Sequence, residues 1–197
     1  MIRPKRHYDR QAEIARAAAE VISTRGIRNT HLRHIARHMG VTTGTLQHYF
    51  DSKEDLLQLA ANRSMDQIFA RAIAESEKAQ GLDALRTFCE LLLPLDEERR
   101  RAWQAAVAFN GATIGDQHLS DLEAARYEAT QKRCAELIQR LQRSGTLSSK
   151  LDANQAGYGL IAFIEGLSMQ LIFSRKQRKA TYTRKLLQQY LQRMLEV

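Results

Sequence analysis

Apolar residues recur at steps of three and four along most of the chain, and this periodicity restricts the fold more than any other feature. Runs with this spacing cover residues 9–24, 32–39, 52–79, 82–93, 99–111, 119–143, 153–174 and 181–195. Because an α-helix holds 3.6 residues per turn, such spacing lines one helix face with apolar side chains. We find no competing alternation of apolar and polar residues typical of strands. The pattern predicts an all-α protein of about nine helices.

The composition agrees with a helical protein that buries a core. Hydrophobic residues make up 44% and charged residues 26%, with only two prolines among 197 residues. No continuous apolar run approaches the roughly 18 residues of a membrane span, and no apolar segment of a secretory signal follows the basic N-terminus. We therefore expect a cytoplasmic protein. Cys89 and Cys134 lie on apolar stripes without metal-ligand or redox spacing, so we expect both in the core.

Positive charge is concentrated near the N-terminus. Residues 1–50 hold nine Lys or Arg against three acidic residues, whereas the other 147 hold 21 against 19. The same fifty residues hold five of the six histidines. Such an excess favours a surface that meets a polyanion such as DNA. A solvated basic face without a partner would show the same excess, so charge alone leaves both interpretations open.

The N-terminal fifty residues have the proportions of a helix-turn-helix. Gly26 ends the first apolar run, Gly40 ends the second, and Thr42 is placed to cap a short third helix. Ser52 is placed to cap the next, long helix. Three short helices joined by tight turns are typical of this motif. The alternative is a small three-helix domain whose polar surface has no DNA-binding role.

The short third helix has two different sides. Leu46 and Tyr49 fall together on one of them, and Thr43, Gly44 and Gln47 fall on the other. A glutamine amide can pair bidentately with adenine in the major groove, and a glycine lets the backbone approach closely. This helix is therefore predicted to read DNA bases, with its apolar side anchored.

The segment HLRHIARHMGVTTGTLQHYFDSKEDLL resembles the DNA-binding domain of TetR-family transcriptional repressors over about residues 9–58. The residues that fit the family signature are Gly40, Val41, Thr42, Gly44, Leu46, Tyr49, Phe50, Lys53 and Leu56. The resemblance implies a repressor, not an enzyme, that a small-molecule effector releases from a palindromic operator. It implies base contacts by Thr43, Gly44 and Gln47, and phosphate contacts by Thr30, Arg33, Thr45, His48, Tyr49 and Lys53. The family usually has Thr or Ser where this chain has His31, so we expect Thr30 to cap the second helix instead.

The C-terminal part, with AGYGLIAFIEGLSMQLIFS and AWQAAVAFNGA, is similar to the regulatory domain of the Bet-type, choline-responsive branch of that family. We expect a DNA-binding domain at residues 1–55 and a helical effector-binding and dimerisation domain at 56–197. The helix at 153–174 is apolar nearly all round, which predicts burial on two sides. With the last helix it is expected to form half of a symmetric four-helix interface. The expected dimer contacts are Tyr158, Ile161, Glu165, Leu171, Leu187 and Leu191; burial within one chain is the alternative.

Aromatic and polar residues on the inner stripes of the second domain are candidates for an effector pocket. They are Phe88, Trp103, Phe109, His118, Tyr127, Phe163 and Met169. Trp103, with Glu165 as a buried acid, would suit a cationic ligand such as a quaternary ammonium ion. A place for Glu165 in the dimer interface is the alternative.

Other chemistry has little support. His31, His34 and His38 share one helix side, but no carboxylate or cysteine joins them, so we predict no metal and no cofactor. If these imidazoles face phosphates, DNA affinity would rise as pH falls. Motifs for phosphate loops, nucleophile elbows and zinc peptidases are missing from the sequence. Two rivals remain: a helical enzyme or carrier with a vestigial N-terminal domain, and an amphipathic protein of the membrane surface.

Overall fold

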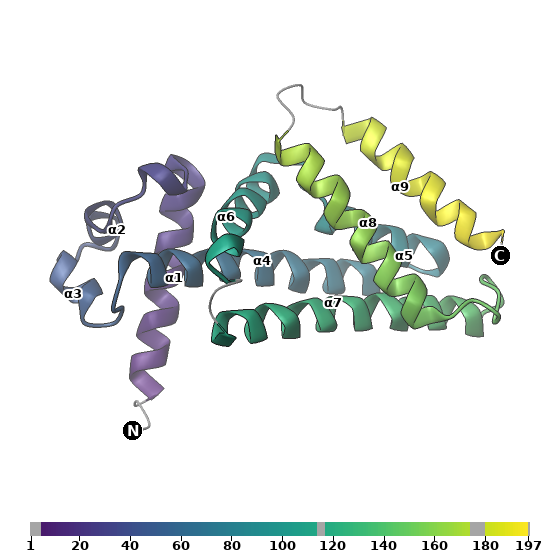
Figure 1. Ribbon diagram of the computed structural model, residues 1–197, viewed down its shortest axis with the longest axis horizontal. Coiled ribbons are helices and arrows are strands. Elements are labelled where there is room, and N and C mark those ends of the chain that lie inside the picture. Colours follow the sequence, from purple (N-terminus) through teal and green to yellow (C-terminus); the bar gives the residue numbers. More distant parts are fainter. Residues whose placement is uncertain (1–4, 114–116, 174–179, 197) are drawn as a thin grey trace. The chain divides into compact units, whose positions relative to one another are not determined.

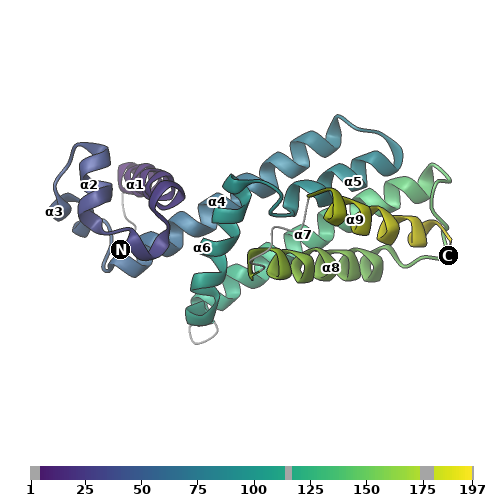
Figure 2. The same ribbon diagram turned by 90° about the horizontal axis from the view of Figure 1, so that it is seen from above.

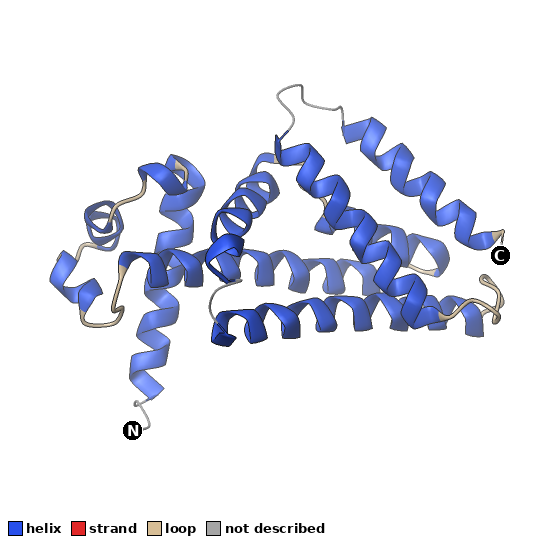
Figure 3. Cartoon of the chain, viewed as in Figure 1, coloured by secondary structure: helices blue, strands red, loops and turns tan. Residues whose placement is uncertain are grey.

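The computed structural model describes residues 5–113, 117–173 and 180–196. Within these ranges the chain forms nine α-helices and one short 3-10 helix, and it contains no strand (Figure 3). The predicted all-α fold is confirmed. The elements in chain order are α1 Lys5–Arg25, η1 Ile27–Asn29, α2 Leu32–Met39, α3 Thr43–Gln47, α4 Lys53–Glu77, α5 Gly81–Leu92, α6 Glu97–Thr113, α7 Gln117–Arg143, α8 Ala153–Phe173 and α9 Ala180–Leu195 (Figure 1).

The chain divides into two compact units, which we describe separately. The first unit comprises Met1–Gln67 and Arg101–Gly111, and the second comprises Ile68–Arg100 and Ala112–Val197. Both α4 and α6 contribute residues to each unit. The domain limits expected from the sequence, 1–55 and 56–197, stay a prediction.

Helices begin and end where the sequence places capping residues. Gly40 takes a left-handed conformation at φ 68° after α2, which glycine adopts without strain. Thr42 caps α3, because its Oγ1 accepts a hydrogen bond of 3.2 Å from the Thr45 N–H. Ser52 Oγ does the same for α4, accepting from the Asp55 N–H at 3.0 Å. These three expectations are confirmed.

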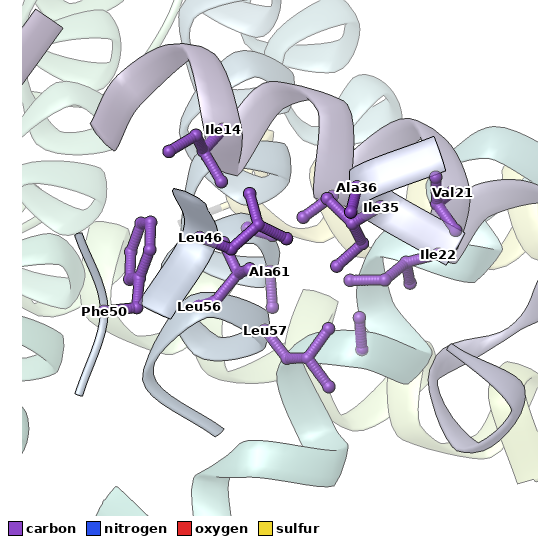
Figure 4. Packing of buried hydrophobic residues seen from close by; sticks show 13 residues of the cluster. Ile14, Val21, Ile22, Ile35, Ala36, Leu46, Phe50, Leu56, Leu57 and Ala61 are labelled. Carbon is purple, nitrogen blue, oxygen red and sulfur yellow. The ribbon is translucent and has the colours of Figure 1, made fainter. Parts of the chain in front are cut away.

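The first unit has one hydrophobic core, to which α1, α2, α3 and α4 all contribute (Figure 4). Leu46 of α3 is fully buried in it, and Phe50 is nearly so. The buried members are Ile14, Ala18, Val21, Ile22, Ile35, Ala36, Leu46, Phe50, Leu56, Leu57, Ala60, Ala61 and Ala105. Because α3 has only five residues, this burial, rather than its own hydrogen bonds, must hold it in place.

In the second unit, α8 packs along α7 at close range (Figure 2). A Cβ atom added at Gly157 of α8 would lie 3.1 Å from the backbone nitrogen of Ala135 in α7. Arg100 holds the end of α8 by donating hydrogen bonds to the carbonyl oxygens of Leu171, at 2.8 Å, and Ile172, at 3.2 Å. Glycine at 157 therefore permits a helix contact that any larger side chain would obstruct.

The two cysteines are core residues, as expected. Cys89 of α5 and Cys134 of α7 are both fully buried. Burial raises the pKa of the Cys89 thiol well above its ordinary value, and a hydrogen bond with Cys134 adds to this effect. A thiol that stays protonated is a poor nucleophile and a poor metal ligand.

Among the described residues, α8 is the helix with the highest apolar content relative to its length. By length and composition, α8 could cross a membrane, with a mean hydropathy of 1.4 in its most apolar window. Polar residues interrupt its apolar run, which is therefore shorter than a continuous membrane span. A buried core helix can have the same length and composition. The packing of α8 on α7 accounts for much of its apolar character.

Candidate nucleic-acid interface

The outer side of α3 is exposed while its inner side is anchored. Thr43, Gly44 and Gln47 are exposed, whereas Leu46 is buried. A Cβ atom at Gly44 would meet only Thr42 Oγ1, at 3.7 Å, so the backbone there is open to close approach. No acidic residue occurs between Gly40 and Phe50. Thr43, Gly44 and Gln47, the three residues predicted to touch bases, thus share one accessible, uncharged surface, which we call the α3 face.

Side chains suited to phosphate contacts lie on neighbouring segments. Arg33 is exposed on α2, and Lys53 is the first residue of α4. Thr45 is half-buried, with its hydroxyl 3.0 Å from that of Thr42. The exposed His48 ring stands edge-on to the half-buried Tyr49 ring, with 5.1 Å between ring centroids. Their roles toward DNA stay predictions.

The prediction that Thr30 contacts a phosphate is wrong for this structure. Its side chain is fully buried, and its Oγ1 donates a hydrogen bond of 2.9 Å to the Gly26 carbonyl oxygen. Thr30 does not cap α2 either, because the N-cap position belongs to His31. The hydroxyl instead ties the segment just before α2 to the turn after α1.

One residue that no sequence pattern indicated holds the end of α3. Gln11 of α1 donates a hydrogen bond of 2.8 Å from Nε2 to the Tyr49 carbonyl oxygen. The two residues are 38 positions apart, and Gln11 lies on the polar flank of α1, so local spacing gives no sign of this contact. Through it, α1 positions the backbone of the segment that carries His48 and Tyr49.

The histidines of α2 interact with protein groups. His34 Nδ1 accepts a hydrogen bond of 3.3 Å from the His31 N–H, which requires that nitrogen to be unprotonated. The pKa of His34 is lowered, mainly by desolvation and then by the positive charges of Arg25 and Arg33. His38 Nε2 lies 2.8 Å from a Glu20 carboxylate oxygen. Among the described residues, no group of three or more His, Cys, Asp or Glu side chains is placed to hold a metal ion.

The residues proposed for an effector pocket have different surroundings. Phe88 is fully buried against Phe69, with 6.0 Å between ring centroids. Phe163 stacks on Tyr190 of α9 at 4.3 Å, and Met169 is exposed. Tyr127 is half-buried. Trp103 is buried and belongs to the first unit, and the side chains of Phe109 and His118 lie outside the described residues. The pocket stays a prediction.

The expected dimer contacts need a correction. Within one chain, four of the six side chains are already buried: Ile161 and Leu171 on α8, and Leu187 and Leu191 on α9. They have almost no area left for a partner, because their own chain covers them. Tyr158 is exposed, at 61%, and Glu165 is half-buried.

The opposite side of α8 carries an apolar surface that its own chain leaves open. Tyr158, Met169 and Phe173 are 61%, 38% and 70% exposed, and Ala162 and Gly166 between them are also exposed. Steps of three and four residues place all five on one helix side. We call this surface the α8 stripe.

A tight glycine turn, a capped short helix with a buried anchor and an exposed uncharged face together define a helix-turn-helix DNA-binding regulator. Comparison with known families makes the assignment narrower. Residues 14–60 match the family described as bacterial regulatory proteins, tetR family, and residues 81–196 match the BetI-type transcriptional repressor C-terminal domain. The chain belongs to the TetR family of transcriptional regulators, with a C-terminal domain of BetI type. Members of this family are DNA-binding regulators and not enzymes.

Curated relatives and solved structures agree. The transcriptional regulator PksA of Bacillus subtilis is 28% identical over 83% of this chain and 78% of its own length. The regulator BetI 2 of Chromohalobacter salexigens is 26% identical over 94% and 88%. A crystal structure of a transcriptional regulator from Saccharomonospora viridis in complex with choline has a TM-score of 0.79 and 24% identity, and covers 94% of this chain and 96% of that one.

Proposed function

We propose that this regulator acts in the cytoplasm as a homodimeric repressor whose two α3 faces enter successive major grooves of a palindromic operator. Thr43, Gly44 and Gln47 touch base edges in this proposal. Arg33, Thr45, His48, Tyr49 and Lys53 contact phosphates. Half-sites for two such helices lie about 34 Å apart along B-form DNA.

The observation that carries this proposal is the asymmetry of α3. Leu46 is fully buried, so the helix cannot turn without exposing it, and this fixes the outward direction of Gln47. The uncharged α3 face avoids repulsion by the phosphate backbone, and Arg33 and Lys53 beside it add attraction.

Two substitutions separate base reading from phosphate contact. Gln47→Ala is expected to cost about 1–3 kcal/mol per half-site on the operator and little on random DNA. Lys53→Ala is expected to weaken both alike and to reduce the salt slope by about one for each phosphate that the lysine neutralises. Fluorescence anisotropy with a duplex from upstream of the protein's own gene and a random duplex, over a salt series, measures both.

Lys78→Ala is the matched control, because Lys78 is exposed and lies on the second unit. It removes the same charge and should leave operator binding nearly unchanged. Equal losses on operator and random DNA for Gln47→Ala would refute base reading by the α3 face.

The proposed homodimer forms through the α8 stripes of two copies. Large apolar side chains gathered on one helix face of a monomer mark a binding surface. A two-fold arrangement lets the same stripe serve both partners, since a symmetric interface uses one self-complementary patch. Glu165, beside the stripe, is the only charged residue of α8, so most of the covered surface is free of buried charge.

The proposed effector is a small cationic molecule that binds the second unit and releases the operator. Half-buried Tyr127 and the Glu123 carboxylate near it supply an aromatic ring and negative charge, which suit a cation. The fold is shared with a regulator solved with choline. Adding choline to the operator complex in the same anisotropy assay tests this, and unchanged binding at millimolar choline would exclude choline.

A further inference from the structure

Glu165 places an ionisable group at the edge of the α8 stripe. Steps of four, three and four residues connect Tyr158, Ala162, Glu165 and Met169, so half-buried Glu165 lies at the edge of the stripe. It is the only charged residue among the 21 of α8. A second copy placed on this stripe would cover it.

The groups that act on Glu165 within the described residues all lie on α7. They are Glu123, Arg126 and Tyr127. Arg126 forms an ion pair with Glu123, and its guanidinium carbon lies 5.1 Å from the centre of the Tyr127 ring. The Arg126 and Glu123 side chains are only 21% and 14% exposed. Both carboxyl groups therefore lie near one half-buried guanidinium, which forms its ion pair with Glu123, so ionising Glu165 as well leaves one negative charge uncompensated.

The single chain already favours the neutral form of Glu165. Burial raises the pKa of Glu165 to about 7, against the opposing effect of Arg126, and Glu123 raises it further. Covering the stripe removes the remaining water and increases the cost of the ionised form. Arg126 cannot offset this cost alone, because it already neutralises Glu123.

We propose that the interface of two α8 stripes is proton-linked, so that each copy closes over Glu165 in its protonated, uncharged form. This inference rests on the proposed homodimer and adds its regulation. The carboxyl then acts as a neutral hydrogen-bonding group inside an otherwise apolar contact. A rise in pH weakens the dimer, and with it the simultaneous binding of two operator half-sites.

The direction of the pH dependence follows from which state, monomer or dimer, binds the proton of Glu165 more tightly. Covering Glu165 raises its pKa above the value of about 7 in the single chain, so the dimer binds the proton better. Below that value both states are protonated and the dimer dissociation constant is flat. Above it, the constant rises by up to about tenfold per pH unit for each of two copies, until the dimer also releases its protons.

Sedimentation equilibrium of the full chain between pH 6 and pH 9 measures this dependence. We expect the dissociation constant to rise at least about tenfold from pH 6.5 to pH 8.5. Glu165→Gln, which is neutral at every pH, should remove the slope and dimerise more tightly than the unaltered chain at pH 8.5. Asp83→Asn is the matched control, since it removes one exposed acid on α5 and should keep the slope.

A second variant tests the charge argument without altering Glu165. Glu123→Gln frees Arg126 to pair with an ionised Glu165, so the slope should become shallower; a purely steric role of Glu165 predicts no change. A chain that stays monomeric at every pH would overturn the homodimer itself. A dimer whose dissociation constant does not change with pH, or a Glu165→Gln dimer with the original slope, would overturn only the proton linkage.

Discussion

Replacing Gly157 with alanine tests how closely α7 and α8 pack. The added Cβ atom would lie 3.1 Å from the Ala135 backbone nitrogen and 3.2 Å from the Gln131 carbonyl oxygen. Ordinary contacts of a Cβ atom begin near 3.4 Å. Both neighbours are helix backbone, so neither can rotate away as a side chain would. The two helices must therefore separate by a few tenths of an ångström or bend.

The size of the effect follows from two opposing contributions. Overpacking a well-packed site costs about 1–3 kcal/mol. Replacing glycine by alanine inside a helix returns about 1 kcal/mol through helix propensity. Gly166→Ala, in the same helix, gains the helix propensity without the overpacking, because no atom lies within 4 Å of its Cβ position. The difference between the two variants is therefore expected to be about 1–3 kcal/mol, since propensity cancels.

Urea unfolding at one protein concentration, followed by circular dichroism, gives this difference in the free energy of unfolding. Gly159→Ala is a second control, because its Cβ atom would meet only the Tyr190 hydroxyl, at 3.4 Å. This control also lies outside the α8 stripe, so it separates effects on folding from effects on the dimer. If Gly157→Ala unfolds at the same or higher urea concentration than both controls, the close packing of α7 and α8 is refuted.

Two further predictions concern the first unit. Thr30→Val removes the hydrogen bond to the Gly26 carbonyl oxygen and should cost about 1 kcal/mol in thermal or urea unfolding. At a temperature where both chains are folded, its affinity for operator and random DNA should be unchanged, and an equal loss of affinity for both duplexes would restore Thr30 as a phosphate contact. The lowered pKa of His34 means that folding disfavours protonation of this side chain. The stability that the neutral His34 contributes is therefore present above pH 6.5 and is lost as the pH falls below that value. The melting temperature should accordingly drop more between pH 7.5 and pH 5.5 for the unaltered chain than for His34→Gln, and equal drops would contradict this assignment.

Local patterns in the sequence were sufficient to predict the helices and most of their ends. Capping depends on residues within one turn of each other, as for Thr42 with Thr45 and Ser52 with Asp55. Apolar periodicity likewise placed Leu46 on the inner side of α3, where the structure buries it fully. These features depend on neighbours in the chain, so one sequence contains the required information.

Features that depend on distant segments could not be predicted in this way. Thr30 looks like a surface residue between two helices, yet the packing of α1 and α2 buries it. The contact of Gln11 with the Tyr49 carbonyl joins residues 38 positions apart. The apolar pattern of α8 indicated two buried sides without indicating which side its own chain covers, and Ile161 and Leu171 were expected at the dimer interface for that reason.

The two sides of α8 differ in what they tolerate, and this allows folding and assembly to be separated. The side toward α7 requires a glycine at position 157, because backbone atoms of α7 lie within contact distance of any added Cβ atom. The other side presents Tyr158 and Phe173 to solvent, and half-buried Glu165 lies at the boundary between the two sides, where α7 residues act on it. Gly157→Ala should therefore lower the free energy of unfolding while keeping the pH dependence of dimerisation. Glu165→Gln should remove that pH dependence with little effect on the packing of α7 and α8. If both variants changed both properties alike, the two sides of α8 would not be independent, and the assignment of one to folding and the other to assembly would fail.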